Sequence, residues 1–120
     1  MPILGVGTDI VEIDRIREVF DREAGFSRRI FTSAELNYCL GKESRYMHLA
    51  ARFAAKEAVA KVLGRSFSWQ DVEIVNDGSG KPRVNLYGEA KVVAGDARIH
   101  LSISHTREHA TAVAVVEGLE

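Results

Sequence analysis

One acidic residue, Glu57, stands between two lysines in the alanine-rich stretch RFAAKEAVAKVLG, residues 52–64. A carboxylate beside ammonium groups suits the binding of phosphate, particularly if the carboxylate holds a metal ion. A simpler interpretation exists, because Glu57 and Lys61 are four residues apart on a predicted helix. They could form a surface ion pair worth about 0.2–0.5 kcal/mol. Glu57 alone does not decide between the two.

A second acidic residue, Asp9, lies in the stretch GVGTDI, residues 5–10. This stretch begins like a dinucleotide-binding fingerprint, but Ile10 stands where the third glycine is required, so the likeness is weak. Asp9 is expected at the mouth of a strand, just before a helix. A carboxylate there can be a ligand, or it can simply cap the helix.

Two further features could carry chemistry. The stretch DGSGKP, residues 77–82, is typical of a hairpin turn, and its glycines would let backbone N–H groups approach a phosphate beside Lys81. It lacks the length and the ending of a P-loop. His105 is expected where a strand leads into a turn, and it could be an ordinary surface histidine.

These residues together suit one task, which is to hold a metal ion and a polyphosphate. Mg²⁺ prefers hard oxygen ligands, often one or two carboxylates completed by water and substrate phosphates. Asp9 and Glu57 could provide those carboxylates. The sequence has a single cysteine and no Cys/His cluster that would favour zinc.

Hydrophobic periodicity and turn residues predict the elements that must position these groups. Ile13, Ile16 and Phe20 indicate an amphipathic helix, and Thr32 with Glu35 forms a capping box that starts a second one. The predicted elements are a strand at 3–6 ended by Gly7, a long helix at 44–63 stopped by Gly64, strands at 71–75 and 82–86, a short helix at 88–94, and a hairpin at 99–117 that turns at HTREH.

Composition limits the class of protein. The chain has 120 residues, enough for one domain, which we assign to 1–120, and its 46% hydrophobic and 28% charged residues are typical of a globular protein. A net charge of −1 argues against general nucleic-acid binding. A lone Cys39, an N-terminus unlike a signal peptide and the absence of a long apolar run lead us to expect a cytoplasmic protein without a membrane span.

The spacing of three motifs resembles a known family. GTD at residues 7–9, RFAAKEAVAK at 52–61 and SISHT at 102–106 are similar to the signature of the 4'-phosphopantetheinyl transferases, in particular their short acyl carrier protein synthase type. The resemblance runs from Ile3 to Glu117. It implies a compact α+β domain in which a mainly antiparallel sheet packs against a long helix.

The resemblance also implies an activity. Family members transfer the phosphopantetheine arm of coenzyme A to a serine of acyl carrier protein, in fatty acid biosynthesis, and release adenosine 3',5'-bisphosphate. By matching positions, Asp9 and Glu57 would bind Mg²⁺, with Lys61 adding positive charge as a third catalytic residue. The group that accepts the serine proton stays open between a metal-bound water, Glu57 acting through water, and Asp9.

Further binding residues follow from the same resemblance. Those implied for coenzyme A are Lys56, Lys61, Gly64, Gly80, Lys81, Pro82, His105 and Thr106. Those implied for the acidic acyl carrier protein are Arg15, Arg22, Phe26, Arg29 and Phe53. Family members of this length form homotrimers with each site between two subunits, so we expect a homotrimer.

Two other classes of function compete with this interpretation. A non-catalytic module that binds coenzyme A or a nucleotide would explain the phosphate-friendly residues, but it would not need both carboxylates. A structural interaction protein would explain the arginines near the N-terminus and the apolar hairpin. Magnesium-dependent transfer to a carrier protein would exclude the first, and tight binding of coenzyme A would count against the second.

Overall fold

The computed structural model describes residues 2–64 and 67–118. Strands, α-helices and one 3₁₀ helix, η1, alternate along the chain. Their order is β1 (Ile3–Glu12), α1 (Ile13–Arg22), α2 (Phe26–Ile30), α3 (Ser33–Leu40), α4 (Arg45–Leu63), η1 (Trp69–Asp71), β2 (Val72–Asn76), β3 (Pro82–Leu86), α5 (Gly88–Ala94), β4 (Arg98–His105) and β5 (His109–Glu117).

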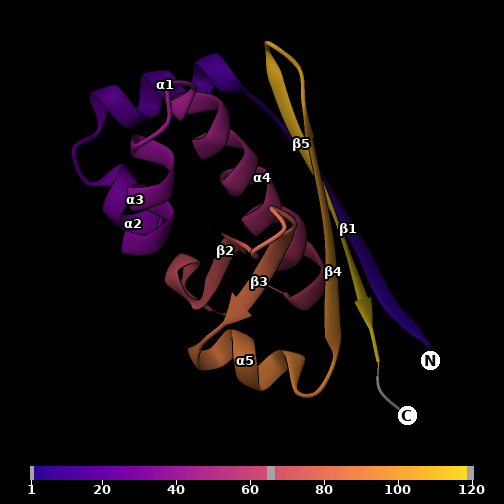
Figure 1. The fold of residues 1–120 in the computed structure, drawn as a ribbon. Helices are drawn as coiled ribbons and strands as arrows, with labels where there is room; N and C mark the ends of the chain where they lie inside the picture. Colours follow the sequence, from indigo (N-terminus) through magenta and orange to yellow (C-terminus); the bar gives the residue numbers. More distant parts are fainter. Residues whose placement is uncertain (1, 65–66, 119–120) are drawn as a thin grey trace.

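Two antiparallel sheets and one long helix form the body of the molecule. β5 lies at the centre of a three-stranded sheet in the order β1-β5-β4, and β2 pairs with β3 in a separate hairpin. Helix α4 runs along the three-stranded sheet, with α1, α2, α3 and the β2–β3 hairpin on its other side (Figure 1). The predicted α+β class with an antiparallel sheet against a long helix is confirmed.

Small residues let α4 approach the sheet closely. Ala110, Ala112 and Ala114 alternate along β5 and are buried, as expected for a strand with one covered face. The alanines of α4 that meet the sheet are also buried. At Gly7 of β1, a Cβ atom would lie 2.2 Å from the carbonyl oxygen of Ala58, so no larger residue fits there without moving the helix.

Local sequence signals end the elements as expected. Thr32 and Glu35 form the predicted capping box of α3, and Gly64 ends α4 with a φ of 95°, which favours glycine. Helix α1 contains the predicted periodic residues Ile13, Ile16 and Phe20, and α5, the β2–β3 hairpin and the C-terminal hairpin match their predicted ranges within a residue or two. None of the helices among residues 2–64 and 67–118 is long and apolar enough to cross a bilayer.

Two local predictions are wrong. The first strand does not stop at Gly7 but continues to Glu12, because its whole length pairs with β5. Asp9 therefore lies inside a strand and is not a helix cap; the residue at the N-cap of α1 is Glu12. The short helices α2 and η1 were not predicted, since five-residue and three-residue segments carry too little periodicity to be detected.

Candidate functional site

Asp9 and Glu57 line the same cavity, which has a volume of about 450 Å³. Asp9 comes from β1 and Glu57 from α4, and the wall between them includes Arg15, Phe53 and His109. We call this cavity the carboxylate pocket. The two residues that the sequence singled out are 48 positions apart in the chain, and the fold brings them to one site.

The register of β1 explains why Asp9 lies in this pocket. Asp9 pairs with Ala112, whose side chain is buried, so both side chains lie on the face of the sheet that α4 covers. β1 is an edge strand, and the side chain of Asp9 stays 16% exposed. Lys61 donates a hydrogen bond of 2.8 Å to the carbonyl oxygen of Thr8 and lies 3.4 Å from Asp9 Oδ1. The predicted positive charge thus lies beside the carboxylate of Asp9.

The chemistry of this pocket fits a hard divalent cation. Two carboxylates from rigid elements can supply part of an octahedral shell, with the rest coming from water and phosphate oxygens, which is the usual arrangement for Mg²⁺. Among residues 2–64 and 67–118, no group of three or more His, Cys, Asp or Glu side chains could hold a metal ion. Asp9 and Glu57 are the pair of carboxylates in this pocket that the sequence predicted for such a cation.

A second cavity, of about 290 Å³, lies along a neighbouring stripe of α4. It is lined by Arg52 and His48 from α4, by Gly80 and Pro82 at the hairpin turn, and by His105 at the end of β4, together with Tyr38, Met47, Ala51, Asn76 and Ile103. We call it the hairpin pocket. Three of the residues predicted to contact coenzyme A, namely Gly80, Pro82 and His105, therefore meet at one place.

A larger cavity, of about 500 Å³, adjoins the hairpin pocket and shares Met47 and His105 with it. Thr106 lines this cavity, with arginines at positions 17, 45 and 107. Thr106 also holds the turn between β4 and β5, because its hydroxyl accepts hydrogen bonds from the backbone N–H groups of Glu108 and His109. Both cavities are rich in cationic donors, which suits a ligand with several phosphates.

Arg52 is the residue that sequence reasoning missed. Its side chain is 4% exposed, its guanidinium lies 4.1 Å from the centre of the Tyr38 ring, and Nη2 donates to Asn76 Oδ1. Nε is buried and has no hydrogen-bond partner among the described residues. An arginine on the buried face of an alanine-rich helix was the available signal, because charged residues are seldom buried without a partner or a function.

Burial and nearby positive charges both act on His48 in the hairpin pocket. The pKa of His48 lies below its ordinary value, first because burial disfavours the imidazolium and then because of the charges on Arg52, Lys42 and His105. His48 also makes an edge-to-face contact with Tyr38, with ring centres 5.6 Å apart. The pocket therefore disfavours a positive charge on His48.

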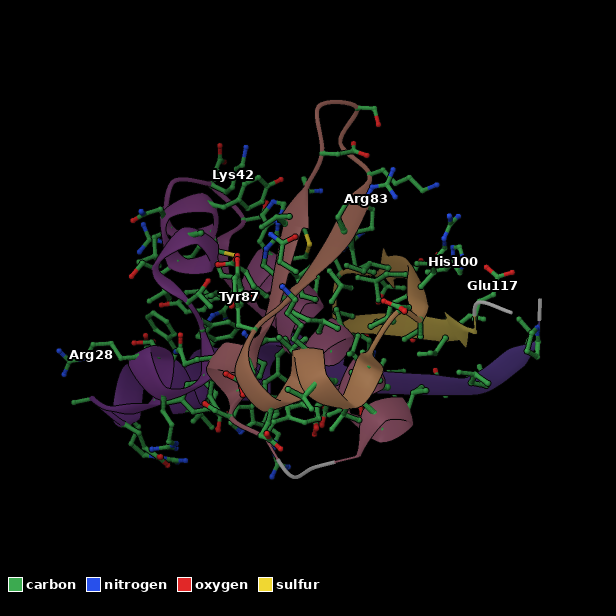
Figure 2. The ribbon with its side chains drawn as sticks, turned by 90° about the horizontal axis from the view of Figure 1, so that it is seen from below. Arg28, Lys42, Arg83, Tyr87, His100 and Glu117 are labelled. Carbon is green, nitrogen blue, oxygen red and sulfur yellow. The ribbon has the colours of Figure 1, made fainter. Side chains whose placement is uncertain are left out.

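Three backbone amides of the β2–β3 turn are used within the turn, so the expectation that they are open to a phosphate is wrong for these three. Asp77 accepts hydrogen bonds from Ser79 N and Lys81 N through Oδ1, and its carbonyl oxygen accepts from Gly80 N. The bond from the Ser79 hydroxyl, the largest cause, lowers the pKa of Asp77 below its ordinary range. Arg83 binds Asp77 Oδ2 at 3.1 Å, and Figure 2 shows Arg83 near the turn end of the hairpin.

Lys56 is not available to a ligand in this structure. Its side chain and that of Glu35 are both 0% exposed, and Nζ lies 2.6 Å from Glu35 Oε1. Glu35 also accepts hydrogen bonds from Thr32 N and Ile74 N. Burial lowers the pKa of Lys56, and the Glu35 carboxylate acts in the opposite direction. The expected contact of Lys56 with a phosphate or a partner is not met, because the ammonium group joins α4 to α3 inside the core.

The remaining predicted residues divide between the carboxylate pocket and the surface. Arg15 and Phe53 line the carboxylate pocket, whereas Arg22 and Arg29 are exposed on α1 and α2. Phe26 is only 8% exposed and packs against Phe31 and Phe53, so it supports this surface from beneath. Lys81 and Gly64 are exposed, at the hairpin turn and the end of α4.

Comparison with known proteins identifies the family. The model of the 4'-phosphopantetheinyl transferase superfamily matches residues 5–114. A holo-[acyl-carrier-protein] synthase from Clostridium novyi is 49% identical over 96% of this chain and 88% of that protein. One from Caldanaerobacter subterraneus is 47% identical over 96% of this chain and 95% of that protein. The chain therefore belongs to the 4'-phosphopantetheinyl transferase superfamily.

Solved structures agree with the sequence comparison. The crystal structure of a holo-ACP synthase from Plasmodium yoelii has a TM-score of 0.87 and 37% identity, and covers 99% of this chain and 98% of that one. A synthase from Bacillus anthracis, solved in complex with CoA (3',5'-ADP), has a TM-score of 0.82 and 37% identity, with 98% of both chains covered. Within the superfamily, the chain groups with the holo-acyl carrier protein synthases and is an enzyme of the phosphopantetheinyl transferase class.

Proposed function

We propose that this protein transfers the 4'-phosphopantetheine group of coenzyme A to a serine hydroxyl of apo acyl carrier protein, with Mg²⁺, and releases adenosine 3',5'-bisphosphate. The observation that carries the proposal is the meeting of Asp9 and Glu57 at one cavity beside Lys61. Several related synthases have been solved with coenzyme A, which agrees with this donor.

Asp9 and Glu57 would hold Mg²⁺ at the diphosphate of coenzyme A. When bound, the ion supplies positive charge that offsets the negative charge developing on the transferred and leaving groups. Lys61 lies next to Asp9 and adds a second positive charge there, while its bond to the Thr8 carbonyl oxygen keeps the ammonium group against β1. The transferred phosphoryl group would thus lie against two rigid elements, β1 and α4.

The serine hydroxyl needs an acceptor for its proton. Asp9 is our leading candidate, directly or through a water molecule, because it lies at an edge strand where an incoming protein can reach it. Glu57 acting through water is the alternative from the same pocket. The two candidates can be told apart by distance. A group that accepts the proton directly must lie within about 2.6–3.2 Å of the hydroxyl oxygen, whereas one that acts through water lies farther away.

The carrier protein would approach from the side of α1 and α2. Arg15 and Phe53 line the carboxylate pocket itself, and Arg22 and Arg29 extend the exposed positive charge away from it. An acidic partner would be steered by these charges and brought with its serine to the pocket. We propose the carrier protein of fatty acid biosynthesis as this partner and the cytoplasm as the compartment.

The nucleotide end of coenzyme A would occupy the hairpin pocket and the adjoining cavity of a neighbouring subunit. The carboxylate pocket lies at the β1 edge of the sheet and the hairpin pocket at the β4 edge, with β5 between them. A cyclic assembly joins two different faces at every contact and can bring the β1 edge of one copy to the β4 edge of the next. We therefore propose a homotrimer.

An apolar surface supports this assembly. Val6 and Ile10 on β1 and Val113 on β5 belong to the sheet face opposite α4, and their exposed fractions are 64%, 67% and 38%. An exposed patch of large apolar side chains on a sheet is typical of an interface between subunits. A second copy is the partner that we propose for this surface.

Intact-mass spectrometry tests the proposed function. Apo acyl carrier protein incubated with coenzyme A, Mg²⁺ and this protein should gain the mass of one phosphopantetheine group. The reaction without the protein, and the reaction with a chelator in place of Mg²⁺, should leave the carrier protein unchanged. Binding of coenzyme A without any mass gain would instead indicate a non-catalytic binding module.

A further inference from the structure

Asn76, the last residue of β2, uses both ends of its carboxamide inside the hairpin pocket. Oδ1 accepts a hydrogen bond from Arg52 Nη2, and Nδ2 donates a bond of 2.8 Å to the carbonyl oxygen of Gly80. Arg52 belongs to α4 and Gly80 to the hairpin turn. One side chain therefore joins the helical wall of the pocket to its hairpin wall.

The two groups that Asn76 joins are already restricted on their other sides. The guanidinium carbon of Arg52 lies 4.1 Å from the centre of the Tyr38 ring, which holds this end of the side chain on one side. Asp77 organises the turn internally through the amides of Ser79 and Lys81. Neither arrangement fixes the turn relative to α4. The bonds of Asn76 provide that link.

The link matters because Arg52 places a positive charge at the wall of the pocket. Its side chain is 4% exposed, and Nε lacks a hydrogen-bond partner among the described residues. An anionic ligand in the pocket would be attracted by the positive charge of the guanidinium group. The position of this charge depends on the bond between Nη2 and Asn76.

We propose that Asn76 is a positioning residue for the donor substrate: it fixes Arg52 and the Gly80 turn relative to each other and so sets the affinity for the nucleotide end of coenzyme A. The proposal rests on the proposed function for the identity of the ligand. The proposed role is one of positioning, because the two hydrogen bonds of the carboxamide connect parts of the protein to each other.

The test is Asn76→Ala in the full-length protein, with the Michaelis constants for coenzyme A and for the carrier protein measured separately. KM for coenzyme A should rise about fivefold to tenfold, the effect of losing one typical hydrogen bond, while kcat and KM for the carrier protein stay within about twofold. Asn76 is exposed, so its truncation leaves no core cavity. Asn76→Ser is a second variant for the same measurement.

Two controls separate positioning from general damage. Asn85→Ala removes the asparagine of the neighbouring strand, which does not line the pocket, and should leave both Michaelis constants unchanged. In an Arg52→Ala background, Asn76→Ala should add less than about twofold, because residues that act through one another are not additive. An unchanged KM for coenzyme A in folded Asn76→Ala protein, or full additivity with Arg52→Ala, would overturn the proposal.

Calorimetric binding of coenzyme A keeps this inference distinct from the proposed function. If the wild-type protein binds coenzyme A but transfers nothing, the proposed function fails, yet the dissociation constant must still rise fivefold to tenfold in Asn76→Ala. If transfer occurs and the dissociation constant does not change, the role of Asn76 fails alone.

Discussion

The carboxylate pocket and the hairpin pocket differ in how their charged groups are held. In the carboxylate pocket, Asp9 and Glu57 lie partly exposed between an edge strand and one side of α4. In the hairpin pocket, Arg52 is buried and fixed by Tyr38 and Asn76. The pocket proposed for chemistry is open to an incoming protein, and the pocket proposed for donor recognition is organised in advance.

A single helix supplies both pockets through two neighbouring stripes. Phe53, Glu57 and Lys61 follow one another at intervals of four residues and lie toward β1. Arg52 and Lys56 form the adjacent stripe, about 100° around the helix, and lie toward α3 and β2. The buried pair of Lys56 with Glu35 therefore fixes the rotation of α4, on which both pockets depend.

The largest effect is expected in the carboxylate pocket. Glu57→Gln or Asp9→Ala should reduce the rate of transfer by more than roughly a hundredfold. Removing a group that only hydrogen-bonds to a metal ligand already costs up to about a hundredfold, and these variants would remove a ligand itself. Binding of coenzyme A should weaken much less if the hairpin pocket holds the nucleotide end. Intact-mass rates and calorimetry on the same preparations measure the two effects. Wild-type rates at limiting Mg²⁺ in either variant would rule out the two-carboxylate site.

Disrupting the buried Lys56–Glu35 pair should affect both pockets, because this pair holds α4 in place. Lys56→Met leaves the Glu35 carboxylate buried without its cation, which should lower the free energy of unfolding by about 3–5 kcal/mol. The double variant Lys56→Met with Glu35→Gln removes the isolated charge and should recover most of this loss. Denaturation with urea measures both variants. Equal loss in the single and double variants would mean that packing, and not the buried charge, dominates at this position.

A smaller effect is expected where the carrier protein docks. Neutralising Arg15, Arg22 and Arg29 together should raise KM for an acidic carrier protein by about tenfold and reduce its salt dependence, because exposed charges act over a Debye length of about 8–10 Å. The affinity for coenzyme A should stay unchanged. An equal loss for both substrates would show that these arginines support the fold or the donor pocket instead.

The smallest effect concerns pH and the hairpin pocket. The pKa of His48 is below its ordinary value of 6.5, so the unfolded chain takes up a proton more readily than the folded one. The contribution of neutral His48 to the free energy of unfolding should therefore be fully present above pH 6.5 and should decrease as the pH falls below it. Thermal unfolding between pH 7 and pH 5 should show a smaller decline in His48→Gln than in the wild type. Identical declines would mean that other groups cause the acid sensitivity.

Residues with strong local signals could be predicted, and residues that depend on tertiary contacts could not. Thr32 with Glu35, the alanines of α4 and the HTREH turn act within a few residues, so they revealed α3, α4 and the last hairpin. Asp9 and Glu57 were found because their residue types and spacing resemble a family. The strand that contains Asp9 was predicted too short, because its second half is fixed by pairing with β5.

The misplaced residues share one physical cause. Lys56 looked like a surface cation, but Glu35, 21 residues earlier, holds it inside the core. The amides of the DGSGKP turn looked available, but the carboxylate and carbonyl group of Asp77 accept their hydrogen bonds. A sequence pattern gives the type of a polar group, and only the fold gives its partner. Arg52 was missed for the same reason.

The most direct test of the account is complementation between two inactive variants. Glu57→Gln chains have a defective carboxylate pocket. Chains that carry both His105→Ala and Arg45→Ala have a defective site for the nucleotide end of coenzyme A, because these two exposed residues line the cavity that adjoins the hairpin pocket. In a cyclic trimer, every mixed assembly contains one contact with both pockets intact, so co-refolding equal amounts should restore about a quarter of wild-type activity. Each variant refolded alone should stay inactive. If native mass spectrometry detects mixed trimers and no activity returns, the two pockets do not form one site between subunits.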